Sequence, residues 1–287
     1  MVMLDAQVSN VMTVDVEDYF HVQAFAGVID RRQWDRYPVR VEQNTRRILE
    51  IFKEFNVRAT FFVLGWVAER YAPLVREIAD AGHEVGCHGY AHKPIYGGDE
   101  KEFRQDVRRA VAVLEKILAT RIRSYRAPSY SVTRDTLWAL DVLADEGFEN
   151  DSSIFPIVHD NYGIPDALRF PHTRQLNHGG SITEFPPSTV RLLGNNVPVA
   201  GGGYLRLYPY RLTSWAIQYL NRQEKQPALV YLHPWEIDAA QPRIAAPWRS
   251  RFRHYQNIGT MESKLKKLLV DFAWQPMGEV LRQRSFM

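Results

Sequence analysis

Two groups of polar side chains that follow apolar segments contain residue types that bind metals. The first group is Asp15, Glu17 and Asp18, directly after the apolar run that begins at Val8. Three carboxylates so close together would repel one another in a buried site, and a bound cation or a shared proton would relieve that repulsion. A solvated turn at a strand end explains the pattern equally well.

The second group is His88 and His92, which follow a short segment ending in Cys87. Two histidines at positions i and i+4 can face one point if the segment turns helically, as in other paired-histidine metal sites. The bland alternative is a pair of surface residues. Cys87 receives no role, because an unpaired buried cysteine is usually a small core residue.

A third polar position, His233, follows the apolar segment Ala228 to Leu232 within the sequence His233-Pro234-Trp235-Glu236. A histidine there suits general acid or base catalysis, because its unperturbed pKa is about 6.5. A hydrogen-bonded structural histidine is the alternative. Trp235 can form a wall that stacks on a sugar, and it can equally belong to the core.

Arg126 precedes Pro128 and Tyr130 in a further short motif. An arginine at a strand end can pair with a carboxylate and fix the orientation of that carboxylate. An ordinary surface salt bridge is the alternative.

The elements that position these residues alternate between strand and helix. This alternation predicts a mostly parallel sheet covered by helices, with the site at the strand ends. The segment from 156 to 203 is rich in Pro, Gly, Asn and His, and we expect it to be loop-rich and to lie on that face. The expected strands are 8–16, 59–65, 83–87, 122–125, 181–185 and 228–232, and the expected helices are 44–55, 73–82, 99–117, 133–147, 212–222 and 263–272.

Composition narrows the class of protein. The chain has 287 residues, of which 45% are hydrophobic and 24% charged, with a net charge of +3 and one cysteine. These values exclude a disordered chain and predict no nucleic-acid partner. The basic and aromatic run Trp248 to His254 is then a solvated or structural segment, or a contact for an anionic glycan or lipid phosphate.

The sequence also bears on location. No segment approaches the roughly 18 to 20 apolar residues that a membrane span needs. Residues 1–12 contain no Lys or Arg and so lack the basic region of a secretory signal. A single cysteine fits a reducing compartment. We therefore predict a cytoplasmic protein.

The order of these motifs resembles the polysaccharide deacetylase family, the NodB-homology domain of carbohydrate esterase family 4. The resemblance spans about residues 8–236, and the segment Ala81 to Gly86 leading into His88 and His92 is especially similar. Three later motifs are similar to the subgroup found with Gram-negative exopolysaccharide and exosortase systems: Gly201 to Tyr204, His233 to Glu236 and Arg251 to Tyr255. We expect one domain over 1–287, with residues 237–287 packed on it as an extension.

The resemblance implies a deformed (β/α) barrel and a divalent metal, commonly zinc. It implies that Asp15 is the general base, that His88 and His92 are ligands, and that His233 is the general acid. Arg126 would orient the base, and a backbone N–H near Tyr130 would hold the oxyanion. Asp151 lies at a position where the family often has another acidic residue, and this residue would adjust the properties of His233. The implied substrate-binding residues are Tyr130, Pro128, Trp235 and Asp151.

The chain departs from the family at the first motif. The common motif has two adjacent aspartates followed by glycine, whereas here Val16 separates Asp15 from Glu17 and Asp18. Asp-x-Asp spacing makes Glu17 the third ligand, and a gapped match makes it Asp18. Alternation along a strand puts Asp15 and Glu17 on one side, which favours Glu17, although a bulge would break that alternation.

The implied activity is removal of N-acetyl groups from N-acetylhexosamine in a polysaccharide or its precursor. A metal would activate water and polarise the acetamide, Asp15 would take a proton, and His233 would protonate the departing amine. The alternatives are hydrolysis of another amide on the same scaffold, such as a cyclic ureide or small amide, and a non-catalytic glycan-binding relic.

Overall fold

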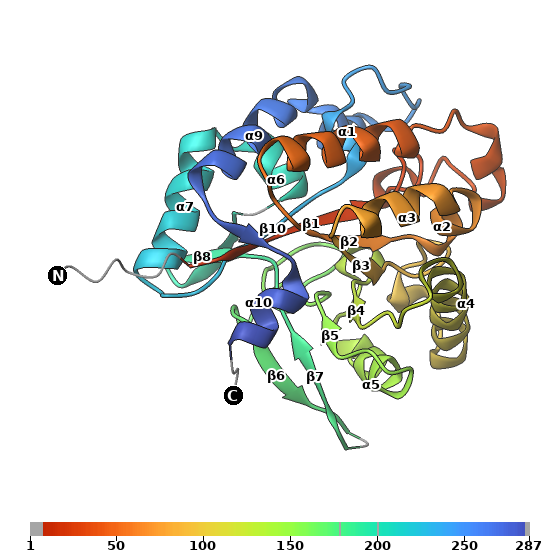
Figure 1. The fold of residues 1–287 in the computed structure, drawn as a ribbon, viewed down its shortest axis with the longest axis horizontal. Helices are drawn as coiled ribbons and strands as arrows, with labels where there is room; N and C mark the ends of the chain where they lie inside the picture. The colour runs from red at the N-terminus through yellow and green to blue at the C-terminus, as the bar shows by residue number, and fades with distance from the viewer. Residues whose placement is uncertain (1–7, 178, 200, 285–287) are drawn as a thin grey trace.

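The computed structural model describes residues 8–284 except 178 and 200. Its centre is a curled sheet of nine strands in the order β10-β1-β2-β3-β4-β5-β7-β6, with β11 pairing with β1 beside that path (Figure 1). All neighbours pair in parallel except β6 and β7, which form an antiparallel hairpin. The expected α/β fold with a deformed (β/α) barrel is thereby confirmed.

The strand sequences show why the sheet is buried. All seven residues of β1, from Asn10 to Val16, are buried, including the polar Asn10, Thr13 and Asp15. Burial of every residue is typical of a parallel strand that is covered on both faces. A second, two-stranded sheet pairs β8 with β9. The bounds are β1 Asn10–Val16, β2 Thr60–Val63, β3 Glu84–Cys87, β4 Ser124–Tyr125, β5 Asn150–Asp151, β6 His172–Gln175, β7 Ser181–Glu184, β8 Thr189–Leu192, β9 Asn195–Pro198, β10 Leu229–Leu232 and β11 Trp274–Gln275.

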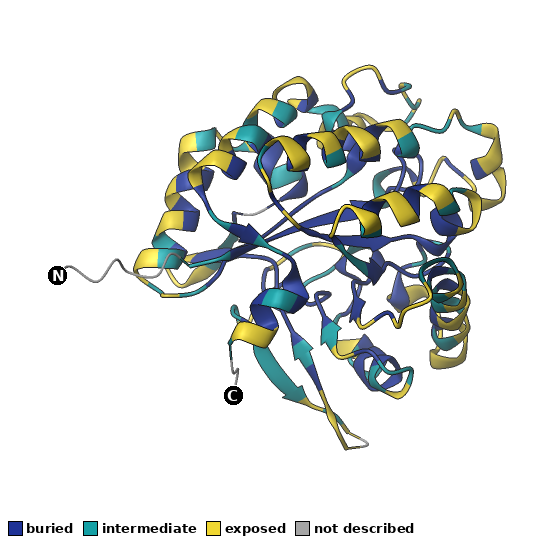
Figure 2. Cartoon of the chain, viewed as in Figure 1, coloured by how far each residue is buried: buried dark blue, intermediate teal, exposed yellow. Residues whose placement is uncertain are grey.

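Helices cover the sheet and turn one apolar face toward it, while their outer faces are exposed (Figure 2). The longest, α4, begins after Asp99, whose carboxylate accepts a hydrogen bond from the Glu102 N–H, as its sequence predicts. The α-helices are α1 Val41–Glu54, α2 Gly65–Arg70, α3 Ala72–Asp80, α4 Glu100–Leu118, α5 Trp138–Asp145, α6 Gly202–Leu207, α7 Tyr210–Arg222, α8 Trp248–Tyr255, α9 Met261–Asp271 and α10 Met277–Gln283. Short 3-10 helices are η1 Gln23–Phe25, η2 Arg31–Arg36, η3 Ile95–Gly97, η4 Pro128–Tyr130, η5 Arg134–Thr136, η6 Pro234–Ile237 and η7 Ile258–Thr260.

The segment 156–203 is loop-rich, as expected, but it contains more strands than the sequence predicted. Besides the expected strand β7, this segment contains β6, β8 and β9. These strands are only four residues long, and much of their surface is exposed, so they lack the apolar alternation that marks a half-buried strand.

The segment after residue 237 packs on the same sheet. Trp274 and Gln275 pair with Asn10 and Val11 at the beginning of β1, and α10 buries Met277, Val280 and Leu281 in a cluster with Val11 and Phe62. In the described part of the chain, no helix is long and apolar enough to cross a membrane.

Candidate active site

The sequence motifs meet at the carboxyl ends of the central strands. Asp15 and Glu17 come from the end of β1, His88 follows β3, Arg126 follows β4 and His233 follows β10. A cavity of about 250 Å³ opens at this edge of the sheet. Its lining includes Asp15, Glu17, His88, His92, Ser129, Tyr130, His233 and Trp235.

Glu17, His88 and His92 form a buried cluster in which one ligand atom of each residue lies within 4.8 Å of the others. The Nε2 atom of His92 is 2.6 Å from Glu17 Oε2. The Nδ1 atom of His88 lies 2.8 Å from the carbonyl oxygen of Arg126, so this nitrogen carries the proton and Nε2 keeps its lone pair. Burial lowers the pKa of His88 to about 4, which keeps the ring in the neutral, metal-binding form. Two imidazoles and a carboxylate are donors that suit zinc.

The two histidines do not meet through a helical turn, because Gly89 and His92 have φ values of 71° and 47°. The segment is instead a loop that Asp106 of α4 holds, since its carboxylate accepts hydrogen bonds from the N–H groups of Tyr90 and Ala91. Sequence reasoning missed Asp106, which is far from the motif along the chain.

The structure brings Glu17, rather than Asp18, to the histidines. The Asp18 carboxylate accepts hydrogen bonds from the Arg40 and Val41 N–H groups, at 2.7 and 2.8 Å, and so caps the beginning of α1. The metal-ligand role considered for Asp18 is therefore corrected to a helix cap. Glu17 is oriented by the indole N–H of Trp235, 3.3 Å from Oε1.

Neighbouring histidines control the charge of Glu17. Burial alone would raise the pKa of this carboxyl, but the charge and hydrogen bond of His92, together with His233 and His88, lower it below its ordinary value. The carboxylate is thus available as a ligand throughout the neutral range.

Arg126 is fully buried and holds Asp15. Its Nη1 donates to Asp15 Oδ1 and to Thr13 Oγ1, both at 2.7 Å, and its Nη2 donates to Ser152 Oγ at 2.8 Å. The guanidinium also lies 4.3 Å from the centre of the Phe62 ring. These contacts occupy one oxygen of Asp15 and fix the direction of the other, Oδ2, which lies 3.8 Å from His233 Nε2.

His233 is oriented by Glu236, which lies in the sequence motif but was assigned no role from it. Glu236 Oε2 lies 3.1 Å from His233 Nδ1 and accepts the His233 backbone N–H at 2.9 Å. Nδ1 therefore carries its proton toward Glu236, and Nε2 faces Asp15 and Glu17 in the cavity. Burial would lower the pKa of His233, but the hydrogen bond and charge of Glu236, with those of Glu17 and Asp15, raise it to about 9.

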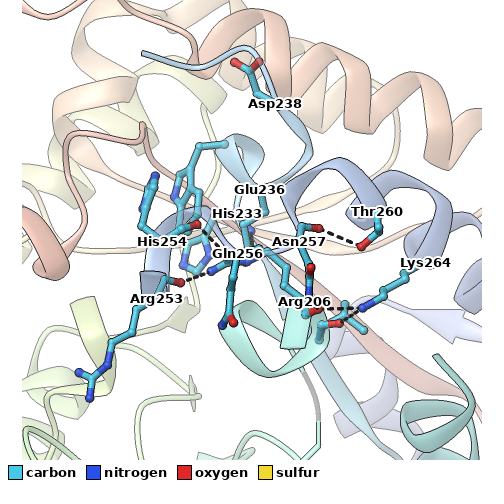
Figure 3. Close-up of polar contacts among 12 residues, drawn as sticks. Arg206, His233, Glu236, Asp238, Arg253, His254, Gln256, Asn257, Thr260 and Lys264 are labelled. Carbon is cyan, nitrogen blue, oxygen red and sulfur yellow. Dashed lines mark hydrogen bonds and ion pairs between the residues drawn. The ribbon is translucent and has the colours of Figure 1, made fainter. Parts of the chain in front are cut away.

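Arg206 of α6 completes this chain of contacts, and sequence reasoning missed it. Its Nε donates to Glu236 Oε1 at 2.7 Å, and both side chains are buried. The pKa of Glu236 would be raised by burial, but Arg206 and His233 lower it to about 2. The remaining Arg206 donors reach the carbonyl oxygens of Arg253, His254 and Gln256, as Figure 3 shows for this region.

Two of the expected substrate-binding residues are buried in other roles. Asp151 does not line the cavity: it is opposite Glu184 in the β5–β7 ladder and accepts a hydrogen bond from Ser153 Oγ at 2.6 Å. Its expected role beside the late histidine is taken by Glu236. Trp235 is only 5% exposed and is stacked between His233 and His254, so it is a packing residue that orients Glu17 rather than an open sugar platform.

Tyr130 lines the cavity as part of η4, whereas Pro128, the expected substrate-binding residue at the start of η4, is buried and does not line it. Ser129 and Tyr130 have φ values of 56° and 50°. The Tyr130 N–H donates to the Ala127 carbonyl at 3.1 Å, so in this structure that group is not a free oxyanion donor. The Tyr130 ring packs on Phe155 and Tyr231 beside the site.

The rim of the cavity carries Tyr96, His159, Asn161, Tyr162 and Arg253. His159 and Tyr162 stack with ring centres 3.8 Å apart. Polar and aromatic side chains at the mouth of a cavity suit a ligand that has both hydroxyl groups and an apolar ring face.

Comparison with known proteins agrees with this geometry. Residues 33–148 match the family model for polysaccharide deacetylases, and residues 152–282 match a domain of unknown function, DUF3473. A peptidoglycan-N-acetylglucosamine deacetylase from Bacillus cereus is 33% identical over 146 residues, which cover 47% of this chain and 52% of that protein. A chitooligosaccharide deacetylase from Rhizobium leguminosarum is 32% identical over 104 residues, or 35% of this chain and 44% of that protein. The chain thus matches about half the length of these curated relatives.

Solved structures resemble the fold over nearly the whole chain. A protein from Mycobacterium smegmatis that is assigned as a polysaccharide deacetylase covers 96% of this chain and 93% of its own, with a TM-score of 0.62 and 20% identity. The structure of Puue allantoinase covers 95% of this chain and 88% of its own chain, with a TM-score of 0.59 and 15% sequence identity. At these identities the likeness shows the fold alone. The two matched regions share one sheet, and the first contains the loop that carries His88 and His92. The chain is therefore similar to polysaccharide deacetylases over residues 33–148 and to the DUF3473 domain over residues 152–282, which is called the DUF3473 region below.

Proposed function

We propose that this chain is a metal-dependent N-deacetylase that acts on N-acetylhexosamine units of a polysaccharide or its precursor. One observation carries the proposal: the buried Glu17, His88 and His92 cluster opens on the same cavity as an arginine-held Asp15 and a glutamate-held His233. A ligand set, a base and an acid around one cavity are the parts that amide hydrolysis requires.

The three ligand residues would hold a divalent cation, for which we propose zinc, and the bound ion would supply Lewis-acid activation of water and of the acetamide carbonyl. Asp15 Oδ2 accepts a proton from the attacking water, while Arg126 keeps Oδ1 in place. His233 donates its Nε2 proton to the amide nitrogen as the carbon–nitrogen bond breaks, and the products are acetate and a free amine. Glu236 stabilises the protonated ring before that transfer.

The glycan itself is proposed more narrowly from two sources. The curated relatives are named for peptidoglycan and chitooligosaccharide, which supports N-acetylglucosamine as the sugar. The motifs Gly201 to Tyr204 and Arg251 to Tyr255, both inside the DUF3473 region, support an exopolysaccharide as the polymer. The single cysteine supports a cytoplasmic site of action.

The test is acetate release by the full chain from N-acetylated oligosaccharides, before and after chelation. We expect release from the zinc-loaded protein, loss after chelation and recovery on adding zinc. Full activity in metal-stripped protein would contradict the metal mechanism. Release of ureide products from allantoin, without acetate from any glycan, would favour the alternative of a cyclic-ureide hydrolase, which the fold of allantoinase permits.

Two variants separate the roles in that assay. Asp15→Asn should retain zinc and lose turnover by about 10²- to 10⁴-fold, because an amide cannot accept the proton. His88→Ala should lose zinc as well. Glycan binding by the zinc-loaded wild type without acetate release from any substrate would identify a non-catalytic relic instead.

A further inference from the structure

Helix α8 exposes an aromatic and basic face that no step of the proposed reaction uses. Trp248 is 71% exposed and Phe252 is 56% exposed, and their i, i+4 spacing places them on one side of the helix. Arg249 and Arg251 are exposed on the same helix. Among the described residues, Trp248 is the most exposed tryptophan and Phe252 is the exposed phenylalanine.

Positive charge is concentrated around this helix. Residues 239–261 contain four arginines and no Asp or Glu, so this segment holds +4 while the whole chain holds +3. The Arg253 guanidinium lies 3.8 Å from Asp160, but both side chains are largely exposed, and such pairs neutralise little of the local field. The face is therefore complementary to an anionic surface.

Contacts on the buried side of α8 hold the helix in place. His254 is buried, stacks on Trp235 with ring centres 4.1 Å apart, and lies 2.7 Å from the Gln241 side-chain oxygen. Arg206 binds the carbonyl oxygens of Arg253, His254 and Gln256 (Figure 3). The exposed aromatic rings thus project from a fixed backbone.

The C-terminal turn of α8 lies beside the cavity. Arg253 and His254 line the cavity, and Phe25 of η1 packs on His254 with ring centres 4.7 Å apart. A surface that covers α8 therefore comes close to the mouth of the cavity.

We propose that this face docks on an anionic lipid bilayer, with Trp248 and Phe252 at the boundary between headgroups and acyl chains and Arg249 and Arg251 on lipid phosphates. Projecting aromatic rings next to arginines match both zones of a membrane interface. A soluble acidic partner would match the positive charge of this face, but it would not explain why two aromatic rings are exposed beside the arginines. This inference does not depend on the proposed activity.

The test is co-sedimentation of the full chain with vesicles of phosphatidylcholine alone or mixed with phosphatidylglycerol. We expect binding to the mixed vesicles that falls as salt is added. Arg249→Gln and Arg251→Gln should each lower the partition coefficient by about five-fold, the usual effect of one cation at an anionic surface. Trp248→Ser with Phe252→Ser should lower it further at any salt concentration.

Matched controls come from α7, where Trp215 is half exposed and Arg211 is exposed. Trp215→Ser and Arg211→Gln should leave vesicle binding unchanged, and circular dichroism should show that every variant remains folded. Absence of binding to the anionic vesicles would overturn the proposal, as would equal losses in the control variants. Binding of soluble alginate through the α8 residues, without vesicle binding, would also overturn it and would identify a glycan surface.

Discussion

At the residue scale, the charged partners of Asp15 and His233 set the directions of the reactive atoms. Arg126 occupies one oxygen of Asp15, and Glu236 occupies the Nδ1 side of His233. Each arrangement leaves one functional atom facing the cavity. Among the charged neighbours of His233, Glu236 raises the pKa of the ring most.

Replacing Glu236 with Gln should therefore shift the pH dependence. In the wild type the pKa of His233 is raised to about 9, so the acid stays protonated, and active, up to that range. Without the carboxylate the pKa should fall toward 6.5, and kcat/KM should decline at a lower pH. Gln keeps an oxygen that can accept from Arg206. Glu279→Gln, at the partly exposed pair with Arg58, is the control. An unchanged alkaline limb would remove Glu236 from the mechanism.

The paired variants Glu17→Ala and Asp18→Ala should separate a ligand from a cap. Glu17→Ala should lose zinc, because it removes one of three clustered donors. Asp18→Ala should keep zinc but lower the free energy of unfolding by about 1 kcal/mol, since two N–H groups at the start of α1 lose their acceptor. Metal content and urea unfolding of both purified proteins decide this. Full zinc occupancy in both variants would show that the drawn ligand set is wrong.

Residue types and spacing were enough to select Asp15, Glu17, His88, His92, Arg126 and His233, which the structure brings to one edge of the sheet. They were not enough to find Asp106 or Arg206. These two residues act through backbone groups and an ion pair that are distant in sequence, and no local pattern marks such partners. Asp151 was misplaced for the related reason that a short strand turns its side chain toward β7.

At the element scale, the DUF3473 region supplies His233 to the active site and supports it through contacts among α6, η6 and α8. Arg206 of α6 contacts Glu236 of η6 and three carbonyl oxygens at the end of α8. Lys264 of α9 in turn donates to the carbonyl oxygens of Leu205, Arg206 and Tyr208 (Figure 3). The long apolar helices and strands were predictable from periodicity, whereas these junctions were not, because they depend on polar contacts between short elements.

Breaking the buried ion pair between Arg206 and Glu236 should lower the stability of the protein. Arg206→Met leaves Glu236 buried without its cation, and we expect the free energy of unfolding to fall by about 3 to 5 kcal/mol. Combining it with Glu236→Gln should recover part of that loss, since the two effects are coupled. Arg134→Met, which breaks an exposed pair with Asp166, should change stability little. Urea unfolding of the wild type, Arg206→Met, the double variant and Arg134→Met measures these changes. Equal effects of Arg206→Met and Arg134→Met would contradict the assigned role of the buried pair.

At the scale of the whole molecule, one sheet carries both matched regions, so a buried defect in it affects the stability of the entire chain. Asp151 and Glu184 place two carboxyl groups inside this sheet. They are opposite each other in neighbouring strands, and both are fully buried. Burial raises the pKa of both groups, and for Glu184 the charge of Asp151 raises it further. The pair is therefore held in the sheet with at least one proton.

This pair should make the molecule less stable as pH rises. A group whose pKa is higher in the folded state binds a proton more tightly there, so its contribution is full below the unfolded pKa of about 4 and is lost as pH passes the raised folded value. Asp151→Asn removes one charge and retains an acceptor for Ser153, so the decline in unfolding free energy from acidic to alkaline pH should become shallower. Urea unfolding of metal-stripped protein at several pH values measures this slope. Asp166→Asn, at an exposed position, is the control and should leave the slope unchanged. An Asp151→Asn slope as steep as that of the wild type would mean that the pair does not share a proton across the sheet.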